Sequence, residues 1–215
     1  MTWAMPALAQ LDRITQREAL AGLKAALEQG SHAAIAALGR SDGFLANPQV
    51  RIPIPESLER TEKLVRRLGF SNEVDELVVA MNRAAEAAVP EARKLLVDAV
   101  KKMSAQDAKS VLTGGHTAAT QYFKRTTRGQ LHARFLPIVQ NATARAGVAQ
   151  RYKDFATPAA AFGLLKTEHA DLDEYVTQKA LDGLYFMLGE EEKKIRRDPV
   201  GSTRAIVRKV FGALP

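Results

Sequence analysis

Residues 80–97 read AMNRAAEAAVPEARKLLV and lie within the longest helical pattern of the chain. Five of the first nine residues are alanine, a side chain small enough to let neighbouring helices approach closely. Asn82, Arg83 and Glu86 place an amide and two charges on or beside that crowded surface, where polar groups need partners. Because Pro90 removes a helical N–H donor, we expect a kink or a tight break at that residue.

Apolar residues recur at helical spacing along the rest of the chain, and no segment shows competing strand alternation. Thr15 begins a predicted capping box, and Ser104 and Ser71 are each predicted to cap a further helix. The sequence therefore predicts an all-α fold, a single bundle of about nine or ten helices over residues 11–215, without internal repeats. The acids of residues 190–192 precede several basic residues, which predicts a solvated helix end.

Residues 39–55 form the one long irregular connection, with turn signals at Ser41-Asp42-Gly43. Apolar residues alternate over 50–54 among prolines, a pattern that predicts an extended strip lying on the helices. Loops of this length are usually functional or disordered. This segment is too apolar for disorder, so we predict a packed, proline-rich loop.

The N-terminus contains Ala7-Leu8-Ala9, which fits the small-x-small end of a secretory signal peptide. We interpret residues 1–10 as the remnant of a leader and expect the chain to begin part-way through a longer signal. A chance match in an alanine-rich protein is the alternative. No apolar run elsewhere is long enough to span a membrane. The sequence thus predicts an exported protein, periplasmic or envelope-associated.

Positive charge is concentrated in one segment. Residues 101–153 hold ten basic residues and one acid, Asp107, which gives +9; the whole chain carries +7, so the remainder sums to −2. Such a segment suits nucleic acid, an anionic membrane or an acidic partner, although a solvated helical face is the simpler interpretation. Aromatic residues interleave with the four candidate cations of this patch: Lys124, Arg125, Arg128 and Arg134. These aromatics also fall at core spacing, and export argues against nucleic acid.

A polar cluster at helix crossings is the best site hypothesis. Its members come from the central helix, the last long helix and the packed loop: Asn82, Arg83, Glu86, Lys179, Asp182, Asp42 and Arg51. The last long helix is apolar around much of its circumference, so we expect Lys179 and Asp182 to be enclosed and able to pair. If the cluster converges, Arg83 would hold a carboxylate or phosphate. The alternative is a structural salt-bridge network that fixes helix register.

Recognisable catalytic and metal-binding motifs are missing from the sequence. The chain has no cysteine, and its four histidines lack metal-binding spacing, so we predict no metal site and no cofactor. There is no Gly-x-Ser-x-Gly elbow and no Ser-x-x-Lys element with its supporting motifs. Thr113-Gly114-Gly115 invites a phosphate-loop interpretation, but a helix C-cap fits better because no Lys-Ser or Lys-Thr follows.

Several segments together resemble an uncharacterised bacterial family known only as a domain of unknown function. The resemblance rests on these segments: Asp42–Leu45 with Arg51–Pro53, Met81–Glu86 with Val89–Ala92, Leu112–Gly115, Arg134–Pro137 and Tyr175–Leu184. It covers nearly all of the chain after the leader and implies an exported helical protein, in many members with a signal or lipoprotein leader. This chain lacks the lipobox cysteine, so a lipid anchor is not implied. His116 and Thr117 stand where the family pattern is often acidic, which weakens a cation site in that turn.

Three functional classes remain open. The first is a non-enzymatic envelope protein that binds an unknown protein partner or a small apolar or anionic ligand. The second is an enzyme, a hydrolase acting through the polar cluster, which the missing nucleophile motif disfavours. The third is binding of an anionic membrane or nucleic acid through residues 101–153, with nucleic acid the less expected partner.

Overall fold

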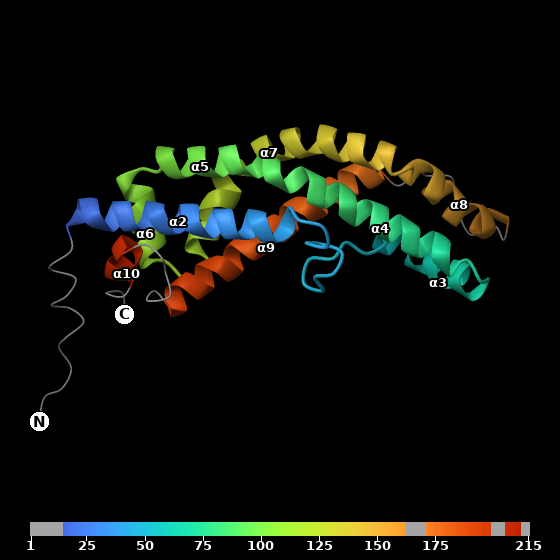
Figure 1. Ribbon diagram of the computed structural model, residues 1–215, viewed down its shortest axis with the longest axis horizontal. Coiled ribbons are helices and arrows are strands. Elements are labelled where there is room, and N and C mark those ends of the chain that lie inside the picture. Colours follow the sequence, from blue (N-terminus) through green and yellow to red (C-terminus); the bar gives the residue numbers. More distant parts are fainter. Residues whose placement is uncertain (1–14, 162–170, 199–204, 212–215) are drawn as a thin grey trace, which may run out of the picture. The chain divides into compact units, whose positions relative to one another are not determined.

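The computed structural model describes residues 15–161, 171–198 and 205–211, and these residues are helical without any strand, which confirms the all-α prediction (Figure 1). The helix count differs slightly from the predicted nine or ten. Residues 1–10, predicted to be a leader, lie outside the described residues. The elements in chain order are α2 (Gln16–Leu38), η1 (Glu56–Leu58), α3 (Glu59–Arg67), α4 (Ser71–Ala88), η2 (Val89–Glu91), α5 (Ala92–Lys102), α6 (Ala105–Thr113), α7 (Ala118–Arg145), α8 (Val148–Ala161), α9 (Leu172–Arg197) and α10 (Ala205–Phe211).

The chain divides into two compact units. Within the described residues, unit 1 comprises 15–34, 93–128, 185–198 and 205–211, and unit 2 comprises 35–92, 129–161 and 171–184. Helices α2, α7 and α9 contribute residues to both units.

Helix termini follow the sequence signals at most positions. The Thr15 hydroxyl accepts from the Glu18 N–H while the Glu18 carboxylate accepts from the Thr15 N–H, and Ser104 and Asp107 form the same capping box at α6. The Ser71 prediction is wrong, because α4 begins at Ser71 and its N-cap is Phe70, without a side-chain cap. Gly69, at φ +93°, lies just beyond α3. Ser71 is already the first helical residue of α4, whereas an N-cap residue needs a non-helical backbone.

The core of unit 1 is built from α2, α5, α6, α10 and the adjoining parts of α7 and α9. Its largest fully buried side chains are Leu23, Leu96 and Phe123. Gly22 on α2 lets α10 pack closely, because a Cβ at that position would lie only 2.4 Å from Val210 Cγ2.

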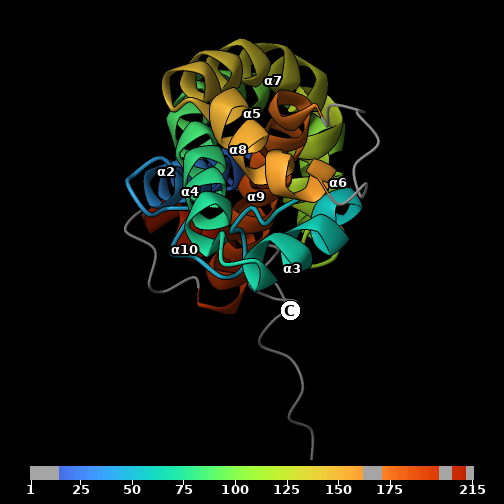
Figure 2. The same cartoon turned by 90° about the vertical axis from the view of Figure 1, so that its right-hand side faces the viewer.

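The core of unit 2 is arranged around α4, which packs against α3 and α8 (Figure 2). The alanines at positions 80, 84, 85 and 88 are buried there, as the small-residue pattern predicts, whereas Ala87 is exposed. At Pro90 the α-helical geometry gives way to the 3-10 turn η2, which confirms the predicted local break.

The loop of residues 39–55 is packed against unit 2, as predicted. Its apolar side chains are buried: Phe44, Val50, Ile52 and Ile54. Gly183 on α9 makes room for the Phe44 ring, because a Cβ there would lie 2.7 Å from Phe44 Cε1. The loop therefore belongs to the unit 2 core.

Candidate functional site

Asn82 joins α4 to the loop through backbone hydrogen bonds. The Ile52 N–H donates to Asn82 Oδ1 (2.9 Å), and Asn82 Nδ2 donates to the Ile52 carbonyl (2.8 Å) and to the Val78 carbonyl (2.8 Å). The side chain is fully buried, so these bonds satisfy both its amide donor and its acceptor where water is excluded.

Glu86, one turn further along α4, holds the first part of the loop. Its Oε1 accepts from the N–H groups of Phe44 (3.0 Å) and Leu45 (3.2 Å), and its Oε2 accepts from Arg83 Nη1 (2.7 Å). A buried carboxylate needs such donors to offset its desolvation. The bonds from two backbone amides make Glu86 an anchor for the loop.

Arg83 links Glu86 to Asp42. Its Nη2 donates to Asp42 Oδ1 (2.8 Å), and Asp42 itself takes a positive φ of 66° in the loop turn. The bond to Glu86, followed by that to Asp42, raises the pKa of the Arg83 guanidinium above its ordinary value despite burial, which lowers it. The Arg83 side chain remains 38% exposed, so its guanidinium is fixed in position and still reachable from solvent.

A groove of about 390 Å³ runs along α4 beside Arg83. One face of α4 forms its floor, with the turn between α7 and α8 opposite; its lining residues are Asn72, Asp75, Glu76, Val79, Ala80, Arg83, Ala146 and Arg151. Arg151 donates through Nη1 to the Ala146 carbonyl, and its Nε lies 3.4 Å from Glu76 Oε2. Val79 is 39% exposed and adds an apolar surface to the groove that Arg83 and Arg151 also line.

The structure brings together four of the seven predicted cluster residues, Asn82, Arg83, Glu86 and Asp42. Arg51 is exposed and forms no side-chain hydrogen bond with any described residue. Lys179 and Asp182, expected to be enclosed, are both exposed, because only the other side of α9 packs inward. The Lys179 ammonium lies 5.7 Å from the Tyr175 ring centroid.

The predicted cationic patch is divided between the two units. Lys124 and Arg125 are exposed and Arg128 is half-buried in unit 1, whereas Arg134 belongs to unit 2. Arg125 pairs with Asp107 (3.2 Å). The interleaved aromatics Tyr122, Phe123 and Phe135 are buried, so they pack in the core and offer no stacking surface.

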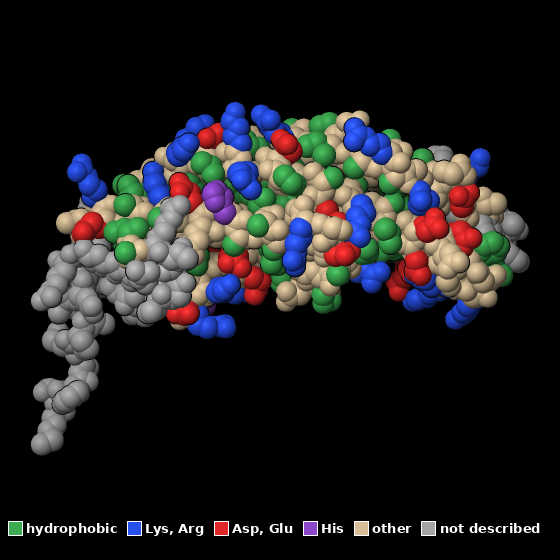
Figure 3. All heavy atoms as spheres, in the orientation of Figure 1, with side chains coloured by type: hydrophobic (Ala, Val, Ile, Leu, Met, Phe, Trp, Pro, Cys, Tyr) green, Lys and Arg blue, Asp and Glu red, His purple; other side chains and the backbone are tan. Residues whose placement is uncertain are grey.

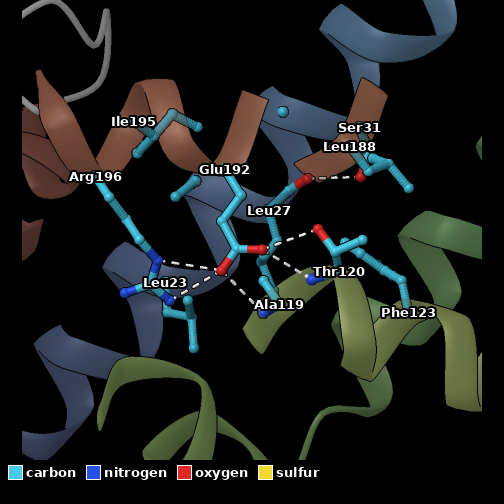
Figure 4. Close-up of a pocket in the computed structure, with 12 residues that line it drawn as sticks. Leu23, Leu27, Ser31, Ala119, Thr120, Phe123, Leu188, Glu192, Ile195 and Arg196 are labelled. Atoms are coloured by element: carbon cyan, nitrogen blue, oxygen red, sulfur yellow. Dashed lines mark hydrogen bonds and ion pairs between the residues drawn. The ribbon is translucent and has the colours of Figure 1, made fainter. Parts of the chain in front are cut away.

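Unit 1 contains a second buried carboxylate, which was not predicted from the sequence. Glu192 accepts from the N–H groups of Ala119 (3.0 Å) and Thr120 (2.9 Å), from the Thr120 hydroxyl (2.9 Å) and from Arg196 (Figure 4). The prediction of a solvated end over residues 190–192 is thus wrong for Glu192. The burial of Glu192 could have been predicted from helical spacing, because Glu192 follows buried Leu188 by four residues and precedes buried Ile195 by three.

The cavity beside Glu192 is small and mainly lined by apolar side chains. It encloses about 20 Å³ and borders Leu23, Leu27, Phe123 and Ile195 (Figure 4). A space of that size holds about one water molecule. The Glu192 carboxylate is already hydrogen-bonded to the amides at the start of α7, so this region is an internal helix anchor. The unit 2 groove is the larger of the two spaces.

In the described part of the chain, no set of three His, Asp or Glu side chains gathers as metal ligands would. None of the helices in that part has the length and apolar character needed to cross a membrane.

These features define a helical protein in which buried carboxylates anchor backbone amides. The chain belongs to the DUF4197 family, described as a protein of unknown function, whose model matches residues 13–212. No curated protein and no solved structure matches the chain. The match confirms the predicted resemblance to a domain of unknown function and assigns no activity.

Proposed function

We propose that this protein is a non-enzymatic binding protein whose unit 2 groove holds a small anionic ligand. The observation that carries the proposal is Arg83, whose guanidinium is fixed by Asp42 and Glu86, is partly exposed, and borders a groove of about 390 Å³. That volume lies in the range of small-molecule sites. Two of the five guanidinium N–H donors are used by the carboxylates, which leaves donors for a ligand carboxylate or phosphate.

Three of the other groove residues suit a ligand with an apolar body, and the two lining carboxylates, Asp75 and Glu76, are already paired with arginines. Val79, Ala80 and Ala146 supply the apolar contacts, and Arg151 supplies a second guanidinium that its own hydrogen bonds hold in place. Prior fixing of both arginines lowers the entropy lost on binding. The preferred ligand class is therefore a small carboxylate or phosphate with an aliphatic portion.

A binding role is preferred to hydrolysis because of how the buried polar groups are used. A hydrolase acting through this cluster would need Glu86 or Asn82 to contact substrate or water. Both side chains are buried and form hydrogen bonds to the loop backbone or to Arg83. Their arrangement supports the binding alternative.

Titration with two defined probes, inorganic phosphate and octanoate, tests the proposal by NMR. Phosphate should shift the Arg83 and Arg151 side-chain signals saturably, and octanoate should also shift the Val79 methyl signals. In Arg151→Gln the shifts should weaken, whereas Arg67→Gln, an exposed change outside the groove lining, should behave like wild type. Absence of saturable shifts with both probes at millimolar concentration would refute the groove as an anion site.

Export to the periplasm or envelope is the second part of the proposal. Its support is Ala7-Leu8-Ala9, the small-x-small sequence typical of signal cleavage sites. N-terminal sequencing of the protein from a periplasmic fraction tests it. The expected mature N-terminus is Gln10, and an uncleaved protein confined to the cytoplasm would contradict export.

A further inference from the structure

Unit 1 carries a group of exposed cations that the groove does not use. Along α5, buried and exposed positions separate cleanly: Ala92, Leu96, Ala99 and Val100 are buried, whereas Arg93, Lys94, Lys101 and Lys102 are exposed. At 100° per residue the four cations fall on one half of the helix. Figure 3 shows Lys and Arg side chains gathered over the stretch that Figure 1 labels α5.

Contacts within unit 1 bring cations from two further helices to α5. The Tyr122 hydroxyl donates to the Ala99 carbonyl (2.8 Å), which ties α7 to α5, and Arg125 pairs with Asp107 (3.2 Å), which ties α7 to α6. We define the basic face as the seven exposed cations of these three helices: Arg93, Lys94, Lys101, Lys102, Lys109, Lys124 and Arg125. The half-buried Asp98 and Asp107 are the acids on the same helical segments, so seven cations less two acids leave +5.

Six of the seven cations of the basic face are unpaired within the described part of the chain. Arg125 pairs with Asp107, whereas the other six side chains form no ion pair with any described residue. Unpaired charges at this density repel one another and favour a polyanion. Solubility alone does not require the four α5 cations to lie on one half of that helix, because mixed charge serves that purpose elsewhere on the chain.

We propose that the basic face binds the surface of an anionic phospholipid membrane. Tyr122 and Phe123 are buried, so the face lacks stacking side chains for single-stranded nucleic acid. Two other helices hydrogen-bond to α5: the Tyr122 hydroxyl of α7 donates to the Ala99 carbonyl, and Lys24 Nζ of α2 donates to the Lys101 carbonyl. A helix embedded in this way does not enter a duplex groove, whereas its exposed cations can meet a broad array of lipid phosphates.

The binding is electrostatic, without insertion into the bilayer. The exposed large apolar side chains of the described residues are Leu68, Phe70, Val79 and Phe186, and none lies on these three helices. Association should therefore depend steeply on salt, because a Debye length of about 10 Å at 0.1 M screens such contacts. Each lysine near an anionic surface should strengthen the association about fivefold.

Vesicle sedimentation with the full chain tests the proposal. Vesicles of phosphatidylglycerol and phosphatidylcholine should bind the protein at low salt and release it at high salt, and pure phosphatidylcholine vesicles should not bind it. The triple variant Lys94→Glu, Lys101→Glu, Lys102→Glu should bind at least about a hundredfold more weakly, because each of the three lysines contributes about fivefold. Circular dichroism should show both proteins folded, since the three side chains are exposed.

The matched control makes the same change of net charge elsewhere. Arg40→Glu, Arg60→Glu, Arg67→Glu alters three exposed residues of unit 2 and should keep most of the vesicle binding. Equal loss in both triple variants would overturn the basic face as the binding surface. Absence of vesicle binding at low salt, or tighter binding to duplex DNA under the same conditions, would overturn the membrane proposal.

Discussion

Glu86 of α4 and Glu192 of α9 are held in the same way. Each buried carboxylate accepts two consecutive backbone N–H groups and pairs with an arginine about one turn away on its own helix. Arg83 precedes Glu86 by three residues, and Arg196 follows Glu192 by four. Charged acceptors strengthen such bonds. One glutamate anchors the loop of residues 39–55, and the other anchors the start of α7.

Replacement of Glu86 tests the loop anchor. Glu86→Leu leaves the Phe44 and Leu45 amides without their acceptor, so we expect a loss of about 2–3 kcal/mol in the free energy of unfolding. Glu86→Gln keeps an amide acceptor and loses the ion pair to a partly exposed arginine, which should cost about 1 kcal/mol. Urea unfolding measures both, and hydrogen exchange at Phe44 and Leu45 locates the effect.

The control for this pair is Glu91→Leu, an exposed residue of η2, which should change stability by no more than about 0.5 kcal/mol. Unchanged exchange at Phe44 and Leu45 in Glu86→Leu would show that the carboxylate does not hold the loop.

Removal of the Glu192 carboxylate should be partly reversible by a small anion. Glu192→Ala leaves the Ala119 and Thr120 amides and Arg196 facing the space that the carboxylate occupied, next to a cavity of about 20 Å³. We expect a loss of about 2–3 kcal/mol. Sodium acetate should raise the melting temperature of the variant more than sodium chloride of equal ionic strength does. An equal response to acetate in wild type would contradict a specific rescue.

Two glycine-to-alanine changes should have opposite signs. Gly183→Ala places a Cβ 2.7 Å from the Phe44 ring and should destabilise the protein by about 1–3 kcal/mol through overpacking. Gly129 lies inside α7 with nothing within 4 Å of the added Cβ, so Gly129→Ala should stabilise by about 0.5–1 kcal/mol. Thermal unfolding distinguishes them, and a Phe44→Leu change should relieve part of the Gly183→Ala cost.

Acid should weaken one surface contact in a predictable direction. Gln178 and His132 hydrogen-bond the Glu174 carboxylate (2.7 and 2.9 Å) and lower the pKa of Glu174 below its ordinary value. A depressed folded-state pKa contributes stability above the unfolded value, about 4.5, and this stability is lost as the pH falls through the folded value. The urea midpoint of wild type should therefore fall more steeply below that pH than the midpoint of Glu174→Gln.

The effect should be small because Glu174 is partly exposed. Glu91→Gln, an exposed carboxyl without such contacts, serves as control and should follow wild type. Parallel curves for wild type and Glu174→Gln would rule out the contribution.

Much of the unit 2 cluster could be predicted because local spacing determines it. Asn82, Arg83 and Glu86 lie on one helix within about a turn. The apolar segment of residues 39–55 is expected to be buried, and its backbone N–H groups are buried with it. Burial of such a segment creates a need for acceptors. The polar side chains of the alanine-rich helix supply them.

The remaining members could not be predicted in this way. Lys179 and Asp182 lie three residues apart on the outward side of α9, and a broadly apolar composition does not reveal which side faces outward. Glu192 was concealed by its neighbours in a charged run, and its partners at Ala119 and Thr120 are more than 70 residues away in sequence. Long-range partners of this kind leave no local signal.

Native mass spectrometry, paired with a denatured run of the same sample, tests the groove most directly. Wild-type protein purified gently from its native host should carry an added mass that denaturation releases. Val79→Trp, which fills the groove, should lack that mass, and Ala87→Trp, an exposed position of α4 outside the groove, should retain it. A clean polypeptide mass for wild type, or an added mass that persists in Val79→Trp, would contradict ligand binding at this site.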